Sequence, residues 1–254
     1  MRKALLASLK RSLQGRGFLL AFLGAALVVL FAAFESFLGA FRSEQLLPYG
    51  YHHSLILSAL SSQPMALALP ILCALPYTAA FLDDVKSGFI KAYLPRTTVT
   101  RYITSQALAC AISGGLALFM GILVAYGLAA LLLLPLEAMR DYLLEPPGYF
   151  LQLLETLVMF FASGAFWALV GLTFATLTNS RYMAYASPFV LFYLLVILYE
   201  RYFDKLYILY PREWLNPSGR WVFGRIGVAV LLLELSALMA LLFAWAAKRR
   251  LRQI

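Results

Sequence analysis

The chain has 254 residues, of which 63% are hydrophobic and only 13% are charged, whereas a soluble domain carries roughly 25% charged residues. This composition excludes an ordinary soluble domain and predicts an integral membrane protein. The net charge of +9 does not indicate nucleic-acid binding, because the Lys and Arg residues flank apolar runs instead of forming a separate basic region.

The first 16 residues have the pattern of a helix that lies on a membrane. Leucines recur at helical spacing among basic residues, at Leu5, Leu6, Leu9 and Leu13. Such an apolar face is typical of an interfacial helix on anionic lipid; a flexible basic tail is the alternative. The apolar run that follows is longer than the roughly 7–15 residues of a signal-peptide core, so an uncleaved first span is expected.

Six apolar segments predict membrane-spanning helices, because one crossing needs roughly 20 predominantly apolar residues. They are 17–38, 58–82, 103–134, 150–177, 183–200 and 225–247. The predicted fold class is therefore all-α: a polytopic integral membrane protein with six transmembrane helices in a single transmembrane domain. The third segment exceeds one crossing and is expected to tilt or to continue past the bilayer. Six spans place both termini on one side.

Three prolines interrupt the second apolar segment at regular intervals. Pro64 follows Ser61-Ser62-Gln63, where a helix start tolerates proline, whereas Pro70 and Pro76 should each remove an interior hydrogen bond and kink the span. A kinked span suits a moving part, and helix packing around the kinks explains the pattern equally well.

The basic residues predict the orientation, because positive side chains that flank spans are retained in the cytoplasm. With the N-terminus inside, most Lys and Arg residues fall on the cytoplasmic side, while nearly all acids other than Asp83 and Asp84 fall outside. Both termini are therefore expected in the cytoplasm. The chain is expected in a cell membrane, the bacterial cytoplasmic membrane, where it is in direct contact with lipid.

The cytoplasmic loop 83–101 is short, yet it contains Gly, Pro and several charges. We expect Asp84 to cap a short helix, and Gly88 to allow another protein to approach closely. Phe89 and Ile90 are expected to be exposed as an apolar anchor, which is typical of a small interface. These residues predict a compact docking element.

Two basic residues of the same loop, Lys91 and Arg96, are expected to meet acids or phospholipid at the rim of this anchor, and Arg101 is expected to re-enter the membrane interface with Tyr102. The alternative for the whole loop is a positively charged connector with solvated acids.

The outer loop 201–224 mixes Tyr, Trp and Phe with charged residues, and Pro211 and the turn Asn216-Pro217-Ser218-Gly219 interrupt it. An aromatic belt in the outer membrane interface explains this composition. A partly re-entrant outer gate is the alternative.

No known nucleotide-binding or hydrolytic motif occurs in the chain, so we expect no catalytic residues. No metal site is expected either. His52 and His53 are adjacent and diverge on a helix, and Cys73 and Cys110 are lone residues within apolar runs. The chain itself is expected to bind no cofactor.

Glu234 stands near the middle of the sixth apolar segment. An ionisable side chain inside a membrane is costly and suggests a functional site. Glu234 is a candidate for the translocation route, and a proton relay or a protonated hydrogen bond to another helix are the alternatives.

Several short stretches share their residue types and order with one known family: Phe81–Gly88, Leu94-Pro95, Arg101-Tyr102 and Trp214–Ser218. They resemble the first cytoplasmic loop and the outer loop of the permease subunits of type-2 ATP-binding-cassette (ABC) transporters. The number of spans, the amphipathic N-terminus and the two internal termini are similar to that family as well. Two positions depart from that family, which usually has Glu where this chain has Asp84 and commonly has Lys where this chain has Gln106.

The resemblance implies a permease subunit of an ABC exporter, with a cytoplasmic coupling helix between spans 2 and 3 that docks on a separate ATPase. The coupling residues it implies are Asp84, Gly88, Phe89, Ile90, Lys91, Arg96 and Arg101. It also implies a second copy of the permease, or a related permease, as partner, and ATP and Mg²⁺ bound by the ATPase. No nucleic-acid partner is expected.

Two other classes of protein remain. An ATPase-independent channel or secondary transporter would work without the ATPase, but a single intramembrane acid at Glu234 is a weak basis for ion coupling. An intramembrane enzyme is disfavoured because the spans contain no paired His or acids. Drugs, lipids, peptides and polyketides all suit an apolar chamber as substrates.

Overall fold

The computed structural model describes residues 2–43, 45–138, 148–203, 206–221 and 223–253. Within these ranges the chain is all-α. The α-helices are α1 (Arg2–Leu13), α2 (Arg16–Ala32), α3 (Phe34–Arg42), α4 (Tyr51–Leu60), α5 (Gln63–Ala74), α6 (Ala80–Lys86), α7 (Phe89–Tyr93), α8 (Val99–Leu133), α9 (Tyr149–Thr178), α10 (Arg181–Arg201) and α11 (Gly224–Leu251). Short 3₁₀ helices cover Leu94–Arg96 (η1), Leu134–Leu136 (η2) and Tyr207–Leu209 (η3).

The long apolar helices confirm the polytopic membrane character. Among the described residues, α8 with η2, α9, α10 and α11 are each long and apolar enough to cross a membrane. Two bent pairs, α1 with α2 at 55° and α4 with α5 at 67°, bring the number of possible spans from 4 to 6. The predicted spans 3 to 6 correspond closely to α8, α9, α10 and α11.

The second predicted span differs most from expectation. The apolar run folds as α4 and α5 with a break at Ser61-Ser62, and Pro64 lies in the first turn of α5, where proline is tolerated. Pro70 lies inside the continuous helix α5. The kink expected at Pro76 is instead a helix end, because α5 stops at Ala74 and turns lead to α6.

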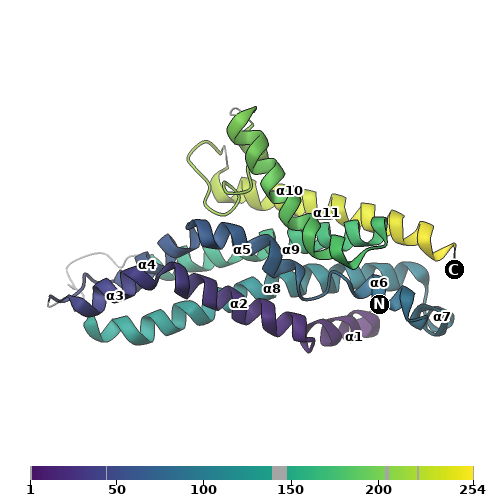
Figure 1. Ribbon diagram of the computed structural model, residues 1–254, viewed down its shortest axis with the longest axis horizontal. Helices are drawn as coiled ribbons and strands as arrows, with labels where there is room; N and C mark the ends of the chain where they lie inside the picture. Colours follow the sequence, from purple (N-terminus) through teal and green to yellow (C-terminus); the bar gives the residue numbers. More distant parts are fainter. Residues whose placement is uncertain (1, 44, 139–147, 204–205, 222, 254) are drawn as a thin grey trace.

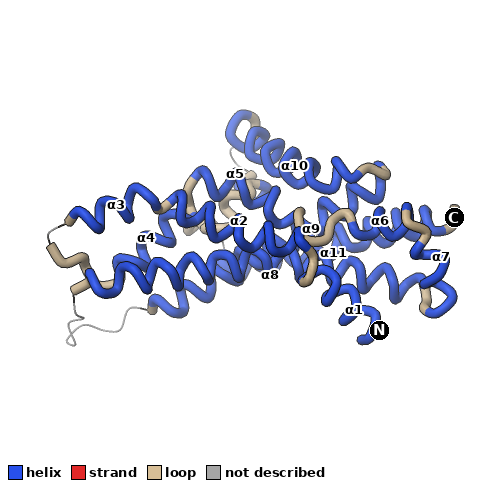
Figure 2. The backbone as a smooth tube through the Cα atoms, turned by 60° about the horizontal axis from the view of Figure 1, so that its bottom comes forward, coloured by secondary structure: helices blue, strands red, loops and turns tan. Residues whose placement is uncertain are grey.

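The helices form an elongated bundle with both chain ends near one tip. In Figures 1 and 2, α1, the end of α11, and α6 with α7 all lie toward the same end of the long axis. α3 and α4 lie toward the opposite end. The 83–101 loop therefore shares its end of the molecule with both termini, as six spans require.

α8 and α9 pack against each other along the centre of the bundle, and small residues make this close approach possible. A Cβ atom added to Gly114 of α8 would lie 2.5 Å from the Cβ of Ala168 and 3.0 Å from the carbonyl oxygen of Gly164. Membrane helices have little hydrophobic force between them, so they associate through such close van der Waals packing. Gly114 is therefore a packing residue of the core.

Trp214 anchors the loop between α10 and α11 in the core. Its side chain is buried, stacks on Trp167 of α9 with 5.9 Å between ring centroids, and donates from Nε1 to the Ile208 carbonyl at 2.8 Å. The resemblance had singled out this tryptophan as part of an outer-loop motif. The structure shows that it attaches the described part of the loop to α9.

The two adjacent histidines point to different partners. His52 Nδ1 lies 2.7 Å from Glu137 Oε1, and the Glu137 carboxylate also accepts the backbone N–H groups of Gly50 and His52 at 2.9 and 2.8 Å. His53 Nε2 instead lies 3.2 Å from the Gln152 side chain. As expected for neighbours on a helix, the two rings diverge, and they tie α4 to the segment after α8 and to α9.

Candidate functional site

The predicted docking loop consists of two short helices joined by a tight turn. α6 ends at Lys86, and Gly88 then adopts φ +74°, which is left-handed backbone that favours glycine. α7 follows, and Pro95 helps to end it through η1 before Thr98 precedes α8. A Cβ atom on Gly88 would meet open space among the described residues. The backbone angle alone therefore favours glycine at this position.

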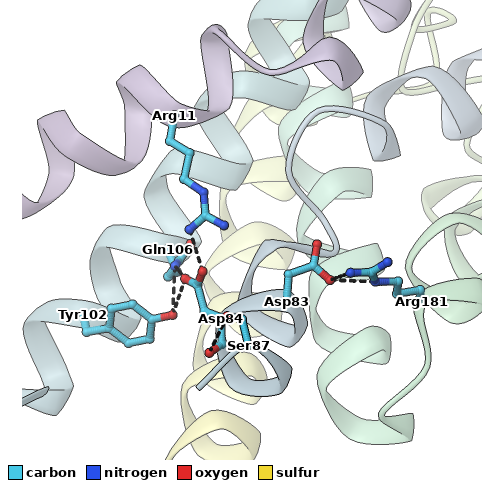
Figure 3. Close-up of polar contacts among 7 residues, drawn as sticks. All are labelled: Arg11, Asp83, Asp84, Ser87, Tyr102, Gln106 and Arg181. Carbon is cyan, nitrogen blue, oxygen red and sulfur yellow. Dashed lines mark hydrogen bonds and ion pairs between the residues drawn. The ribbon is translucent and has the colours of Figure 1, made fainter. Parts of the chain in front are cut away.

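Asp84 is the centre of a buried polar network at the base of this loop (Figure 3). Arg11 Nη1 lies 2.5 Å from Asp84 Oδ1, while the Tyr102 hydroxyl and the Gln106 amide donate to Oδ2 at 2.7 and 2.8 Å. Only 1% of Asp84 is exposed. A buried carboxylate is costly unless it is paired and hydrogen-bonded, and these donors satisfy it.

The prediction that Asp84 caps a helix is therefore wrong. Asp84 is in the second half of α6, whose N-cap is Ala79. Its carboxylate points toward α1 and α8, because the donors that satisfy it, Arg11, Tyr102 and Gln106, lie there. Asp84 holds the loop in place and is not available as a surface contact.

Helical spacing explains why α8 can supply two of these donors. Tyr102 and Gln106 are four residues apart and lie on one face of α8, and the Gln106 amide also donates to the Tyr102 hydroxyl at 3.0 Å. Gln106, where the resembling family commonly has Lys, supplies a neutral donor. The positive charge comes instead from Arg11 of α1.

The neighbouring acid, Asp83, makes a second connection on the other side of the loop. Arg181 Nη2 and Nε lie 2.6 and 2.7 Å from Asp83 Oδ1. Figure 3 shows the two acids pointing in opposite directions, Asp84 toward α1 and α8 and Asp83 toward the start of α10. α6 is thereby joined to three other helices through two adjacent side chains.

The expected apolar anchor is only half exposed. Phe89 is 45% exposed and stacks on Tyr93 with 5.3 Å between ring centroids, but Ile90 is 2% exposed. The prediction that Ile90 is exposed is wrong, because the first turn of α7 directs it into the cluster around Phe81 and Tyr102. We define the loop face as the exposed residues Lys86, Ser87, Gly88, Phe89, Lys91, Ala92 and Pro95.

The remaining predicted residues are spread over the molecule. Lys91 lies on the loop face, and Arg101 is exposed on the first turn of α8. Arg96 belongs to η1, and its side chain lies outside the described residues. Glu234 is exposed on α11 and makes no hydrogen bond or ion pair to any described residue of the loop.

Reasoning from the sequence missed the partners of the two acids. Arg11 was recognised only as part of a basic amphipathic helix, and Arg181 only as an orientation signal. One signal was available: an acid at the end of an apolar run must find a cation or several donors when it is buried. The sequence does not indicate which of the Lys and Arg residues comes near.

A scan against protein-family models finds no match to this chain, and a search of curated proteins finds no match either. The type-2 ABC permease family therefore stays a prediction from the resemblance of the two loops. The geometry of α6, α7 and their neighbours carries the functional argument.

Proposed function

We propose that this chain is the permease subunit of an ABC exporter, which moves substrate out of the cytoplasm with energy from a separate ATPase docked on the 83–101 loop. Two permease copies, or two related permeases, form the pathway in a bacterial cytoplasmic membrane, with both termini inside. ATP and Mg²⁺ are bound by the ATPase and not by this chain.

The observation that carries this proposal is the combination of an exposed loop face with a buried attachment. Phe89 and Lys91 offer an aromatic ring and a positive charge to a partner. Directly behind them, Asp84 and Asp83 join α6 to α1, α8 and α10. A connector that served only to join two spans would not need this attachment.

The attachment suggests how work would reach the membrane. A partner that pulls or tilts the loop face displaces α6 and, with it, the Asp84 carboxylate. Arg11 and Tyr102, which donate hydrogen bonds to this carboxylate, must then move with it or leave it unpaired in a buried site. Moving together is the less costly response. The displacement then passes to α1 and α8, and through Arg181 to α10.

The test is co-expression of the tagged chain with an ABC ATPase encoded beside its gene, followed by copurification and measurement of ATP hydrolysis. Phe89→Ala should weaken binding about thirty-fold, since truncating an interface anchor costs about 2 kcal/mol or more. Tyr182→Ala is the matched control, because Tyr182 is also an exposed aromatic residue, at the start of α10 and outside the loop face.

Equal ATPase binding by the wild-type chain and both variants would contradict docking on the loop face. Substrate flux through the purified chain alone, without any ATPase or ATP, would instead establish a channel or secondary transporter.

A further inference from the structure

A cavity of about 510 Å³ opens at the break between α4 and α5. Its walls come from both of these helices, from the first three turns of α9, from the first turn of α11, and from residues 210–216 of the loop that Trp214 anchors. It lies outside the 83–101 loop and shares no lining residue with it. The proposed coupling function does not use this cavity.

The break exposes polar groups within an otherwise apolar segment. Ser58, Ser61 and Ser62 all line the cavity. Their hydroxyls donate to carbonyls of α4 at 2.7, 3.2 and 2.5 Å, respectively. A hydroxyl that donates in this way keeps lone pairs with which to accept. These three side chains can therefore accept hydrogen bonds from hydroxyl groups of a ligand.

Arg212 supplies an uncompensated positive charge at the same place. Its Nη2 donates to Gln63 Oε1 at 2.8 Å, which positions the guanidinium beside the start of α5. Its Nε is buried and has no hydrogen-bond partner among the described residues. No carboxylate of the described chain lies within ion-pair distance of Arg212. A buried donor without a partner is costly, so this nitrogen indicates a missing acceptor.

Two other charged groups line the cavity. Arg225 is paired with Glu155, whereas Glu213 keeps its negative charge and its Oε2 accepts a backbone N–H at 2.9 Å. Burial raises the pKa of Tyr210, so its phenol stays neutral and adds no negative charge. The Arg212 guanidinium, which pairs with neither acid, is therefore the group of this wall that attracts an anion.

The N-terminus of α5 adds to this attraction. α5 has 12 residues, and its N-cap Ser62 makes no side-chain hydrogen bond to the first turn. Pro64 has no N–H, but the other first N–H groups of α5 lack intrahelical acceptors and carry a partial positive charge, which favours a phosphate or carboxylate. In broken membrane helices, such internal helix starts commonly face anionic groups of a ligand.

From these contacts we propose that the cavity binds a ligand that has both a phosphate group and hydroxyl groups. The phosphate lies between Arg212 and the start of α5, and the hydroxyls donate to Ser58 and Ser61. The two or three non-bridging oxygens of a phosphodiester or a phosphate monoester suit the several donors there. Both a soluble polyol phosphate and the headgroup of a phosphatidylglycerol-type lipid have this chemistry. The proposal goes beyond the coupling function and holds whether or not an ATPase drives the protein.

The experiment uses the full purified chain in nanodiscs of phosphatidylcholine. Binding of glycerol 3-phosphate is measured by calorimetry, with glycerol as the probe that lacks phosphate. In a second arm, native mass spectrometry compares retention of phosphatidylglycerol and phosphatidylcholine. We expect glycerol 3-phosphate, phosphatidylglycerol or both to bind, and Arg212→Gln to weaken that binding at least about tenfold. Arg220→Gln should leave it unchanged, because Arg220 is an exposed arginine of the same loop that does not line the cavity.

A second variant keeps the proposal testable if Arg212→Gln disturbs the loop. Ser61 is exposed at the break, so Ser61→Asp should fold and should repel the phosphate, again lowering affinity at least about tenfold. Binding in the calorimetric arm identifies a soluble ligand, and binding in the lipid arm alone identifies a headgroup. Binding of neither probe, or equal binding by wild type, Arg212→Gln and Ser61→Asp, would overturn the proposal.

Discussion

Arg11 and Asp84 are separated by 73 positions in the chain, yet Arg11 Nη1 lies 2.5 Å from Asp84 Oδ1. This ion pair joins the N-terminal helix α1 to α6, at the base of the proposed docking loop. The Asp84 side chain is almost fully buried, whereas half of the Arg11 side chain is exposed. The carboxylate is therefore the partner whose loss leaves unsatisfied groups inside the protein.

The two adjacent acids should differ sharply in their contribution to stability. Asp84→Ala leaves the Tyr102 hydroxyl and the Gln106 amide without their buried acceptor, and should lower the free energy of unfolding by about 2–4 kcal/mol. Asp83→Ala breaks a largely exposed pair with Arg181 and should cost less than about 1 kcal/mol. Unfolding in mixed detergent micelles measures both. Equal effects would show that the Asp84 network does not hold the loop.

Close packing of α8 and α9 can be tested at two glycines of the same helix. Gly114→Leu should destabilise the protein by at least about 1–3 kcal/mol, because its side chain would collide with α9. A Cβ atom at Gly127 meets nothing within 4 Å, so Gly127→Leu should be neutral or slightly stabilising, since leucine is the better helix former. Thermal unfolding of the two purified variants is the measurement, and a tolerated Gly114→Leu would contradict the packing.

Membrane orientation can be tested with single introduced cysteines. Both native cysteines, Cys73 and Cys110, are buried, so background labelling should be low. With both termini inside, a membrane-impermeant maleimide should label Gly219→Cys in intact cells and Lys91→Cys only after permeabilisation. The reverse pattern would invert the orientation. Arg140, another position expected outside, lies beyond the described residues.

Glu234 is expected to lie in an interface between two copies of the chain. It is exposed on α11, and a charged side chain facing lipid near a bilayer centre costs about 2.5–3.5 kcal/mol. If a second copy covers it, Glu234→Leu should weaken self-association while Glu234→Gln, which keeps the hydrogen-bonding capacity, should not. Light scattering of the chain in detergent measures the mass. A wild-type monomer would remove Glu234 from any interface between copies.

Most of the helices follow from the sequence because their signals are local. Apolar runs of membrane length predicted α8, α9, α10 and α11 nearly to their ends, and the polar break before Pro64 fits a helix start. Gly88 was expected only to let a partner approach closely, and the structure adds that it occupies the left-handed conformation that glycine favours. Each of these features depends on neighbours only a few residues away.

The exposure of individual loop residues was not readable in the same way. Ile90 and Phe89 are adjacent apolar residues, and the sequence does not distinguish the one that packs inside from the one that faces out. The direction of α7 relative to α8 decides this, and it depends on where Tyr102 and Phe81 lie.

The sequence by itself determined the all-α class, the membrane-length helices and the helix start at Pro64, because these depend on composition and short-range periodicity. Only the tertiary structure decided that Asp84 is buried against Arg11, that Trp214 holds the outer loop on α9, and that Arg212 faces a polar cavity at the start of α5. The physical reason is common to all three. Partners far apart in the chain are selected by packing of whole helices, and the cost of an unpaired buried group then determines which of the available side chains must meet.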